Sequence, residues 1–127
     1  MRENYRVYFD GSIKKNVIEK GLLSLGYFRQ NPGEFRRKIF VDGRKFYFHA
    51  YLKFDDKRSV WILRVHIDWR RKRDVKVLPF DRRNERRVKK MLPQRVIDAL
   101  RKKWREERRK IESQIDLLQK LQNQVYC

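Results

Sequence analysis

The residues of this chain best suited to chemistry alternate along one segment near its middle. In the stretch KFYFHAYLK, the side chains of Lys45, Tyr47, His49, Tyr51 and Lys53 occupy every second position. In a β-strand such positions share one face. Aromatic rings stack on exposed bases of nucleic acids, and cations beside them neutralise phosphates. The spacing therefore favours nucleic-acid binding by the polar face of a sheet.

Neighbouring segments predict further cations and rings on the same face. The flanking candidates are Arg36, Lys38, Phe40, Arg64, His66 and Arg70. Two structural alternatives compete with binding: an ordinary solvated face, and a face covered by the long C-terminal helix. Tyr and His are common at half-buried positions, and a cross-strand pair such as Lys45 with Asp68 stabilises a sheet without any ligand.

Positive charge is concentrated in one block of the sequence. Between Arg70 and Lys110 there are 19 Lys or Arg and 6 Asp or Glu, a charge of +13 out of +19 for the chain. Such a block is the electrostatic footprint of a polyanion partner. The phosphate-contacting candidates in it are Arg71, Lys72, Arg73, Arg82, Arg83, Arg86, Arg87, Lys89, Lys90, Arg101, Lys102 and Lys103. Neither DNA nor RNA, and neither single nor double strands, is favoured by this pattern.

Catalytic chemistry is poorly represented in the sequence. A metal-dependent nuclease needs acids that converge on a cation; the candidate acids are Glu19, Asp42, Asp55, Asp56 and Asp68. Three of these fall in expected turns, and the chain has no Walker, GxSxG or HExxH motif. We therefore expect a non-catalytic protein without cofactor or metal, and a small metal-dependent nuclease or a protein-only scaffold as alternatives.

The polar face needs a sheet to position it. Residues 5–9 alternate as a short strand, and Asp42-Gly43 predicts a two-residue hairpin turn between strands at 36–41 and 45–54. A third strand, up to residue 70, follows a turn at 55–58 and completes an antiparallel meander. Residues 30–34 are expected to form a loop.

Helical patterns flank this sheet on both sides in the sequence. Apolar spacing predicts a helix over Ile13–Leu25, capped by Asp10 or Ser12 and ended by Gly26, which would cover the apolar face of the sheet. After a short apolar piece at 75–80, Asp81 is placed to cap a basic helix that ends before Pro93. A last helix has no breaker from Gln94 to about Val125.

The end of the last helix carries an apolar stripe and almost no positive charge. Residues 111–127 have a net charge of −1, so phosphate contact is not expected there. The stripe consists of Ile111, Ile115, Leu118, Leu121 and Val125. It must be buried, either within the chain or against a protein partner or a second copy as a homodimer.

Together these patterns predict an α+β protein with two parts. Residues 1–80 form a core of three to four antiparallel strands covered by one helix, and residues 81–127 form a basic helical arm with the association stripe. With a single cysteine, no signal-like start and no apolar run of about 18 residues, we expect an intracellular protein without a membrane segment. A subunit of a ribonucleoprotein or another nucleoprotein assembly fits this description.

Overall fold

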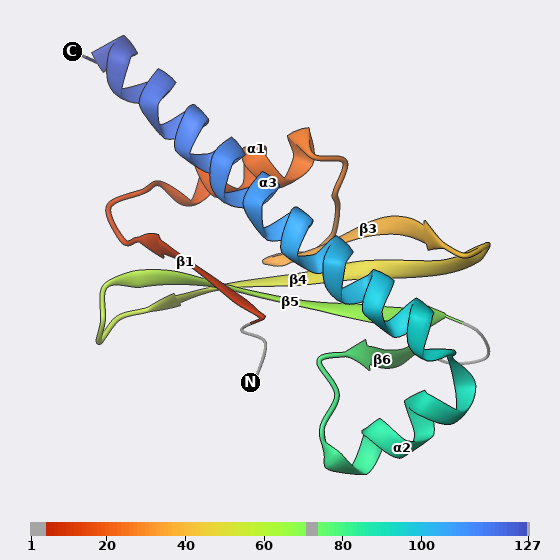
Figure 1. Ribbon diagram of the computed structural model, residues 1–127. Helices are drawn as coiled ribbons and strands as arrows, with labels where there is room; N and C mark the ends of the chain where they lie inside the picture. The colour runs from red at the N-terminus through yellow and green to blue at the C-terminus, as the bar shows by residue number, and fades with distance from the viewer. Residues whose placement is uncertain (1–4, 71–73, 127) are drawn as a thin grey trace.

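The structure is a computed structural model that describes residues 5–70 and 74–126, and Figure 1 shows the arrangement of its elements. The described chain has six strands and three helices, with one helix after the first strand and two helices after the last strand. Their bounds are β1 Arg6–Asp10, α1 Lys15–Ser24, β2 Phe28–Asn31, β3 Glu34–Val41, β4 Arg44–Asp55, β5 Val60–Arg70, β6 Asp74–Leu78, α2 Arg82–Met91 and α3 Gln94–Tyr126.

All six strands form one antiparallel sheet with the order β1-β5-β4-β3-β2, and β6 pairs with the other half of β5. The α+β class is confirmed, but the prediction of three to four strands is too low. The loop expected at 30–34 overlaps β2, whose four residues are all exposed. An edge strand without a buried face leaves no alternation in the sequence, which is why this strand was not predicted.

The central hairpin forms where the sequence places it. Asp42 and Gly43 both have positive φ angles, 52° and 72°, which is the pair of left-handed residues that a tight type I′ turn requires. This turn fixes the register that pairs Phe40 with Lys45 and Arg36 with His49. Because opposed residues share a face, the register also fixes which side chains gather on each side of the sheet.

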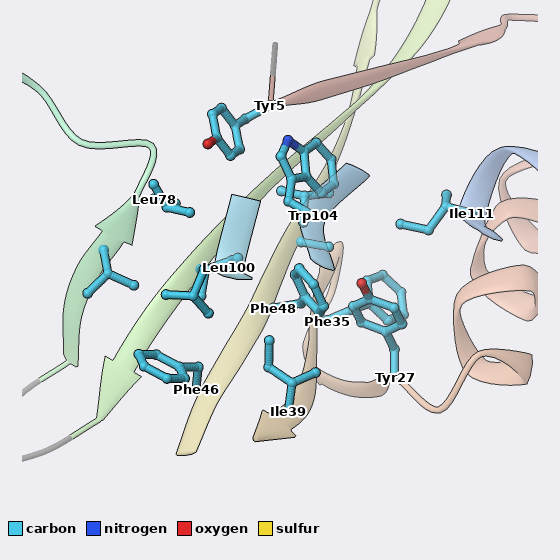
Figure 2. Close-up of a cluster of buried hydrophobic side chains, with 14 of the residues drawn as sticks. Tyr5, Tyr27, Phe35, Ile39, Phe46, Phe48, Leu78, Leu100, Trp104 and Ile111 are labelled. Carbon is cyan, nitrogen blue, oxygen red and sulfur yellow. The ribbon is translucent and has the colours of Figure 1, made fainter. Parts of the chain in front are cut away.

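One side of the sheet carries the hydrophobic core, and α3 is the element that chiefly covers it. Figure 2 shows Leu100 and Trp104 of α3 among Phe35, Phe46 and Phe48 of the sheet. The prediction that the helix near residues 13–25 covers this face alone is therefore wrong. The helix α1 instead packs mainly against α3, so closely that a Cβ on Gly21 would lie 2.7 Å from Ile115.

The same core runs through both predicted parts of the chain. One cluster of buried side chains includes Phe48 and Val65 from the sheet together with Val88, Ile97 and Trp104 from the helices. Tyr5, just before β1, stacks on Trp104 with ring centroids 5.4 Å apart. Residues on either side of position 80 thus share one hydrophobic core.

Helix ends follow the predicted signals in two of three cases. The Asp81 carboxylate accepts a hydrogen bond of 2.9 Å from the Asn84 amide and caps α2, and Gly26, with φ 97°, ends α1. The predicted cap of α1 is wrong. Asp10 instead accepts from the Ser12 amide within its own turn, and the residue before α1, Lys14, makes no side-chain cap.

Among the described residues, no helix combines the length and the apolar character that a membrane crossing requires. The longest helix, α3, is strongly charged over its first half.

Candidate nucleic-acid interface

The side of the sheet opposite the core, here called the open face, carries exposed aromatic rings. The strand register places Tyr8, Phe28, Phe40 and Tyr51 on it, because their cross-strand partners are Ile62, Arg36, Lys45 and Arg64. These four rings are 38% to 61% exposed. Figure 1 shows α1 and α3 together on the other side of the sheet, and the alternative that the long C-terminal helix covers the polar face is excluded.

Exposed cations surround these rings. Six of them lie on the open face by register and are exposed: Arg6, Lys38, Lys45, Lys53, Arg64 and Lys76. The exposed acid Asp10 and the half-buried acid Asp55 lie at one end of the face, beside Val60. The exposed charges on the rest of the face are positive and lie between flat aromatic surfaces.

A polar cluster fills the middle of the open face. His49 lies opposite His66, and Tyr51 and Asp68 come from the same two strands. The Nδ1 atom of His49 is 3.1 Å from Asp68 Oδ2, and its Nε2 atom is 2.5 Å from Glu34 Oε1. His66 Nε2 lies 3.2 Å from the other oxygen of Asp68.

The cluster buries charge at the surface of the sheet. His49 and Asp68 are 4% and 5% exposed. Burial opposes ionisation of Asp68, but the hydrogen bonds with His49 and His66 outweigh it and hold the pKa of Asp68 well below its usual value. Hydrogen bonds from Asn31 and then from His49 likewise lower the pKa of Glu34. Both carboxyl groups are therefore anionic at neutral pH.

Three predicted contact residues of the face, Arg36, Tyr47 and His49, are buried in it. Tyr47 is 8% exposed, and the Arg36 guanidinium, also 8% exposed as a residue, lies 5.9 Å from the centre of the Tyr47 ring. Of the two tyrosines predicted to stack on bases, only Tyr51 presents a large exposed surface. Phe28 and Tyr8 supply exposed rings that sequence reasoning missed. The alternation of Tyr8 with Val7 and Phe9 could have predicted that Tyr8 lies on the polar face. No pattern in the sequence predicted the position of Phe28.

Some residues of the basic block line one hollow of about 1170 Å³ beside α2. Five cations line it: Lys76, Arg82, Arg83, Arg101 and Arg105. Its acids Asp81, Glu85 and Asp98 reduce this charge, and Arg101 also lies over the Phe80 ring at 5.6 Å. Lys76 belongs to both the hollow and the open face, so it joins the two positive surfaces.

The remaining predicted cations are spread over the helices. On α2, Arg86, Arg87, Lys89 and Lys90 are exposed, with Lys89 paired to Glu85 at 2.9 Å. Lys102 is exposed and Lys103 half-buried on α3. The candidates Arg71, Lys72 and Arg73 lie outside the described residues, as does the side chain of Arg70.

Most of the predicted association stripe is used inside the chain. Ile111 and Ile115 are fully buried in the core, and Leu118 is half-buried near Gly21 of α1. Leu121 is 49% exposed, and the side chain of Val125 lies outside the described ones. Intramolecular docking thus accounts for the first half of the stripe.

Comparisons with known proteins found no matching family model, no significantly similar curated protein and no significantly similar solved structure. The geometry of the open face is therefore the basis on which function is inferred.

Proposed function

We propose that this protein binds single-stranded nucleic acid across the open face of its sheet. One observation carries the proposal. Seven large hydrophobic side chains are exposed in the described part of the chain; the three leucines lie on helices, and all four aromatic ones lie on the open face. Aromatic rings gathered on one side of a sheet, with cations between them, form the usual platform for nucleic-acid bases.

The two kinds of side chain have complementary roles. The rings of Phe28 and Phe40, the most exposed aromatics, offer flat apolar surface on which unpaired bases stack. Lys38 precedes Phe40 by two residues on the same face, whereas Lys53 and Arg64 flank Tyr51; these cations neutralise the phosphates that connect the bases. Bases in a duplex already stack on each other, so the rings add affinity only for single-stranded or splayed segments.

The basic hollow extends this surface. A strand that crosses the open face toward β6 reaches Lys76 and then the arginines of α2 and α3. These contacts add affinity that does not depend on sequence, since they involve the phosphate backbone. A role of this kind fits the intracellular location that the lone cysteine favours.

The test compares binding of labelled single-stranded DNA, single-stranded RNA and duplex DNA by fluorescence anisotropy. In the variant Phe28→Ala/Phe40→Ala, we expect affinity for single strands to fall by roughly 10-fold or more, at about 1–3 kcal/mol per stacked base. Affinity for duplex DNA should change little, because it depends on phosphate contacts.

The matched control is Leu23→Ala/Leu117→Ala, which removes two apolar side chains of similar exposure from the helices. This control should bind all three nucleic acids like the wild type. The proposal is wrong if the aromatic variant retains wild-type affinity for single strands, or if the control loses as much affinity as the aromatic variant.

A further inference from the structure

The polar cluster of the open face brings histidine nitrogens and carboxylate oxygens together at hydrogen-bond distance. Both ring nitrogens of His49 face carboxylates, Nδ1 toward Asp68 and Nε2 toward Glu34. A neutral imidazole has one N–H and one lone pair. When Nε2–H of a neutral ring donates to Glu34, the lone pair of Nδ1 lies 3.1 Å from an oxygen of Asp68 and 3.3 Å from the Tyr51 hydroxyl, where it can bind a cation that Asp68 also binds.

A further ring nitrogen converges on the same carboxylate. His66 Nε2 approaches Asp68 Oδ1 at 3.2 Å, and ligand atoms of His49, His66 and Asp68 all lie within 4.8 Å of one another. Two imidazoles and one carboxylate are a donor set that binds zinc and related ions. The convergence of these atoms, with the second carboxylate of Glu34 at the other ring nitrogen of His49, indicates a site for a cation.

We propose that His49, His66 and Asp68 bind one divalent transition-metal ion of the Zn²⁺, Co²⁺ and Ni²⁺ class. Glu34 then accepts the hydrogen bond from His49 Nε2–H and orients the ring, as carboxylates beside metal-bound histidines do. The two carboxylates Glu34 and Asp68 balance the charge of the ion. The proposal does not depend on nucleic-acid binding.

The distances suit such an ion after a small adjustment. Ligand atoms at about 2.0–2.2 Å from a tetrahedral ion lie roughly 3.3–3.5 Å from each other. The contacts of Asp68 are close to this spacing, but they involve different oxygens: Oδ2 lies 3.1 Å from His49 Nδ1, and Oδ1 lies 3.2 Å from His66 Nε2. The largest separation among the three ligand atoms, up to 4.8 Å, has to close by up to about 1.5 Å when the ion binds, and we expect changes of side-chain rotamer to supply this movement.

The site is reachable from solvent. The His66 side chain is 17% exposed and that of Glu34 is 18% exposed, whereas the His49 and Asp68 side chains are nearly buried. Three protein ligands leave one coordination position for water or another ligand. A metal ion therefore enters from the open face, beside the ring of Tyr51.

The experiment titrates tag-free protein in a Cys127→Ser background with Zn²⁺ by calorimetry and with Co²⁺ by visible absorption. We expect one ion per chain, and Co²⁺ absorption bands of the intensity typical of low coordination number. His66→Gln and Asp68→Asn should each weaken Zn²⁺ binding by at least about 100-fold. Glu34→Gln should weaken it by about 10-fold to 100-fold, the range for outer carboxylate partners.

The control Asp98→Asn removes an exposed acid from α3 and should bind Zn²⁺ like the wild type. Because Asp68→Asn removes a buried group, the wild type also gives an answer that needs no variant. In imidazole ¹⁵N spectra, one equivalent of Zn²⁺ should shift Nδ1 of His49 and Nε2 of His66. The proposal is overturned if no saturable binding occurs at one equivalent, if other nitrogens shift instead, or if His66→Gln binds like the wild type.

Discussion

Each side of the sheet buries one carboxylate, and the two carboxylates have opposite surroundings. On the core side, Glu107 is 1% exposed and accepts hydrogen bonds from the Arg37 guanidinium and from the Tyr27 hydroxyl at 2.7 Å. On the open face, Asp68 is 5% exposed and faces two histidines. Glu107 accepts from an arginine that stays protonated and from a tyrosine hydroxyl that keeps its proton below alkaline pH, whereas each histidine nitrogen beside Asp68 can have either a proton or a lone pair.

This difference separates a structural ion pair from a site able to bind. The two oxygens of Glu107 receive three hydrogen bonds, one from the buried Tyr27 hydroxyl and two from the partly buried Arg37, whose charge balances that of Glu107. The Asp68 cluster lies at the surface of a face that also carries exposed rings and cations. Changes on the core side should therefore alter stability, and changes on the open face should alter binding.

The largest effect is expected from Glu107→Ala. Removal of this carboxylate leaves the partly buried Arg37 charge without its partner, so the free energy of unfolding should fall by about 3–5 kcal/mol. Urea denaturation measures the change, with the exposed neighbour variant Glu106→Ala as control. A loss below about 1 kcal/mol would mean that the ion pair contributes little to the fold.

A second test divides the C-terminal stripe between core and surface. Ile115→Ala should destabilise the protein by about 2–5 kcal/mol, because Ile115 is 1% exposed and touches α1. Leu121→Ala, at a half-exposed position, should cost less than about 0.5 kcal/mol. Light scattering of Leu121→Ala beside the wild type then tests association, since a partner or second copy that binds this end should be lost.

On the open face, substitution of cations should change the salt dependence of binding. For Lys38→Ala/Lys53→Ala/Arg64→Ala, the slope of log K against log salt concentration should become shallower by about 2 for single strands. The urea midpoint should stay the same. The control is Lys15→Ala/Lys20→Ala/Lys110→Ala, which removes exposed cations from the helices. Equal slopes for the two triple variants would contradict the assignment of phosphate contacts to the open face.

The smallest effect concerns alkaline pH and the core side. Burial, followed by the charge of Glu107, raises the pKa of Tyr27 well above its usual value. The folded protein therefore keeps a proton that the unfolded chain loses above about pH 10, so this contribution to stability falls as pH rises, by up to about 1.4 kcal/mol per pH unit. The stability difference between the wild type and Tyr27→Phe should shrink between pH 9 and 11. A constant difference would show that the Tyr27 hydroxyl is open to solvent.

Local signals made much of the fold predictable from the sequence. The alternation in β4, the Asp42-Gly43 turn and the Asp81 cap each depend on a few neighbouring residues, and each is confirmed. Which helix covers the apolar side of the sheet could not be predicted in this way, because two helices far apart in the sequence were candidates. Periodicity shows that a helix has an apolar stripe, but it does not say which surface that stripe meets.

The polar cluster could not be predicted from the sequence for a similar reason. Glu34 was expected in a loop and carried no pattern, and Asp68 was one of five candidate acids, with nothing in the sequence to join it to Glu34. Only the register of three strands brings Glu34, His49, His66 and Asp68 together. Glu107 shows the same limit. It interrupts an apolar spine in the sequence, and its partners Arg37 and Tyr27 are 70 and 80 residues away.

The most direct test of the difference between the two sides is an NMR titration of the wild type with a single-stranded oligonucleotide. Backbone and aromatic side-chain signals are followed together with the methyl groups of the exposed leucines. We predict the largest shifts at Tyr8, Phe28, Phe40 and Tyr51, and almost none at Leu23 and Leu117. Shifts confined to the helices, with the four open-face rings unchanged, would contradict the account.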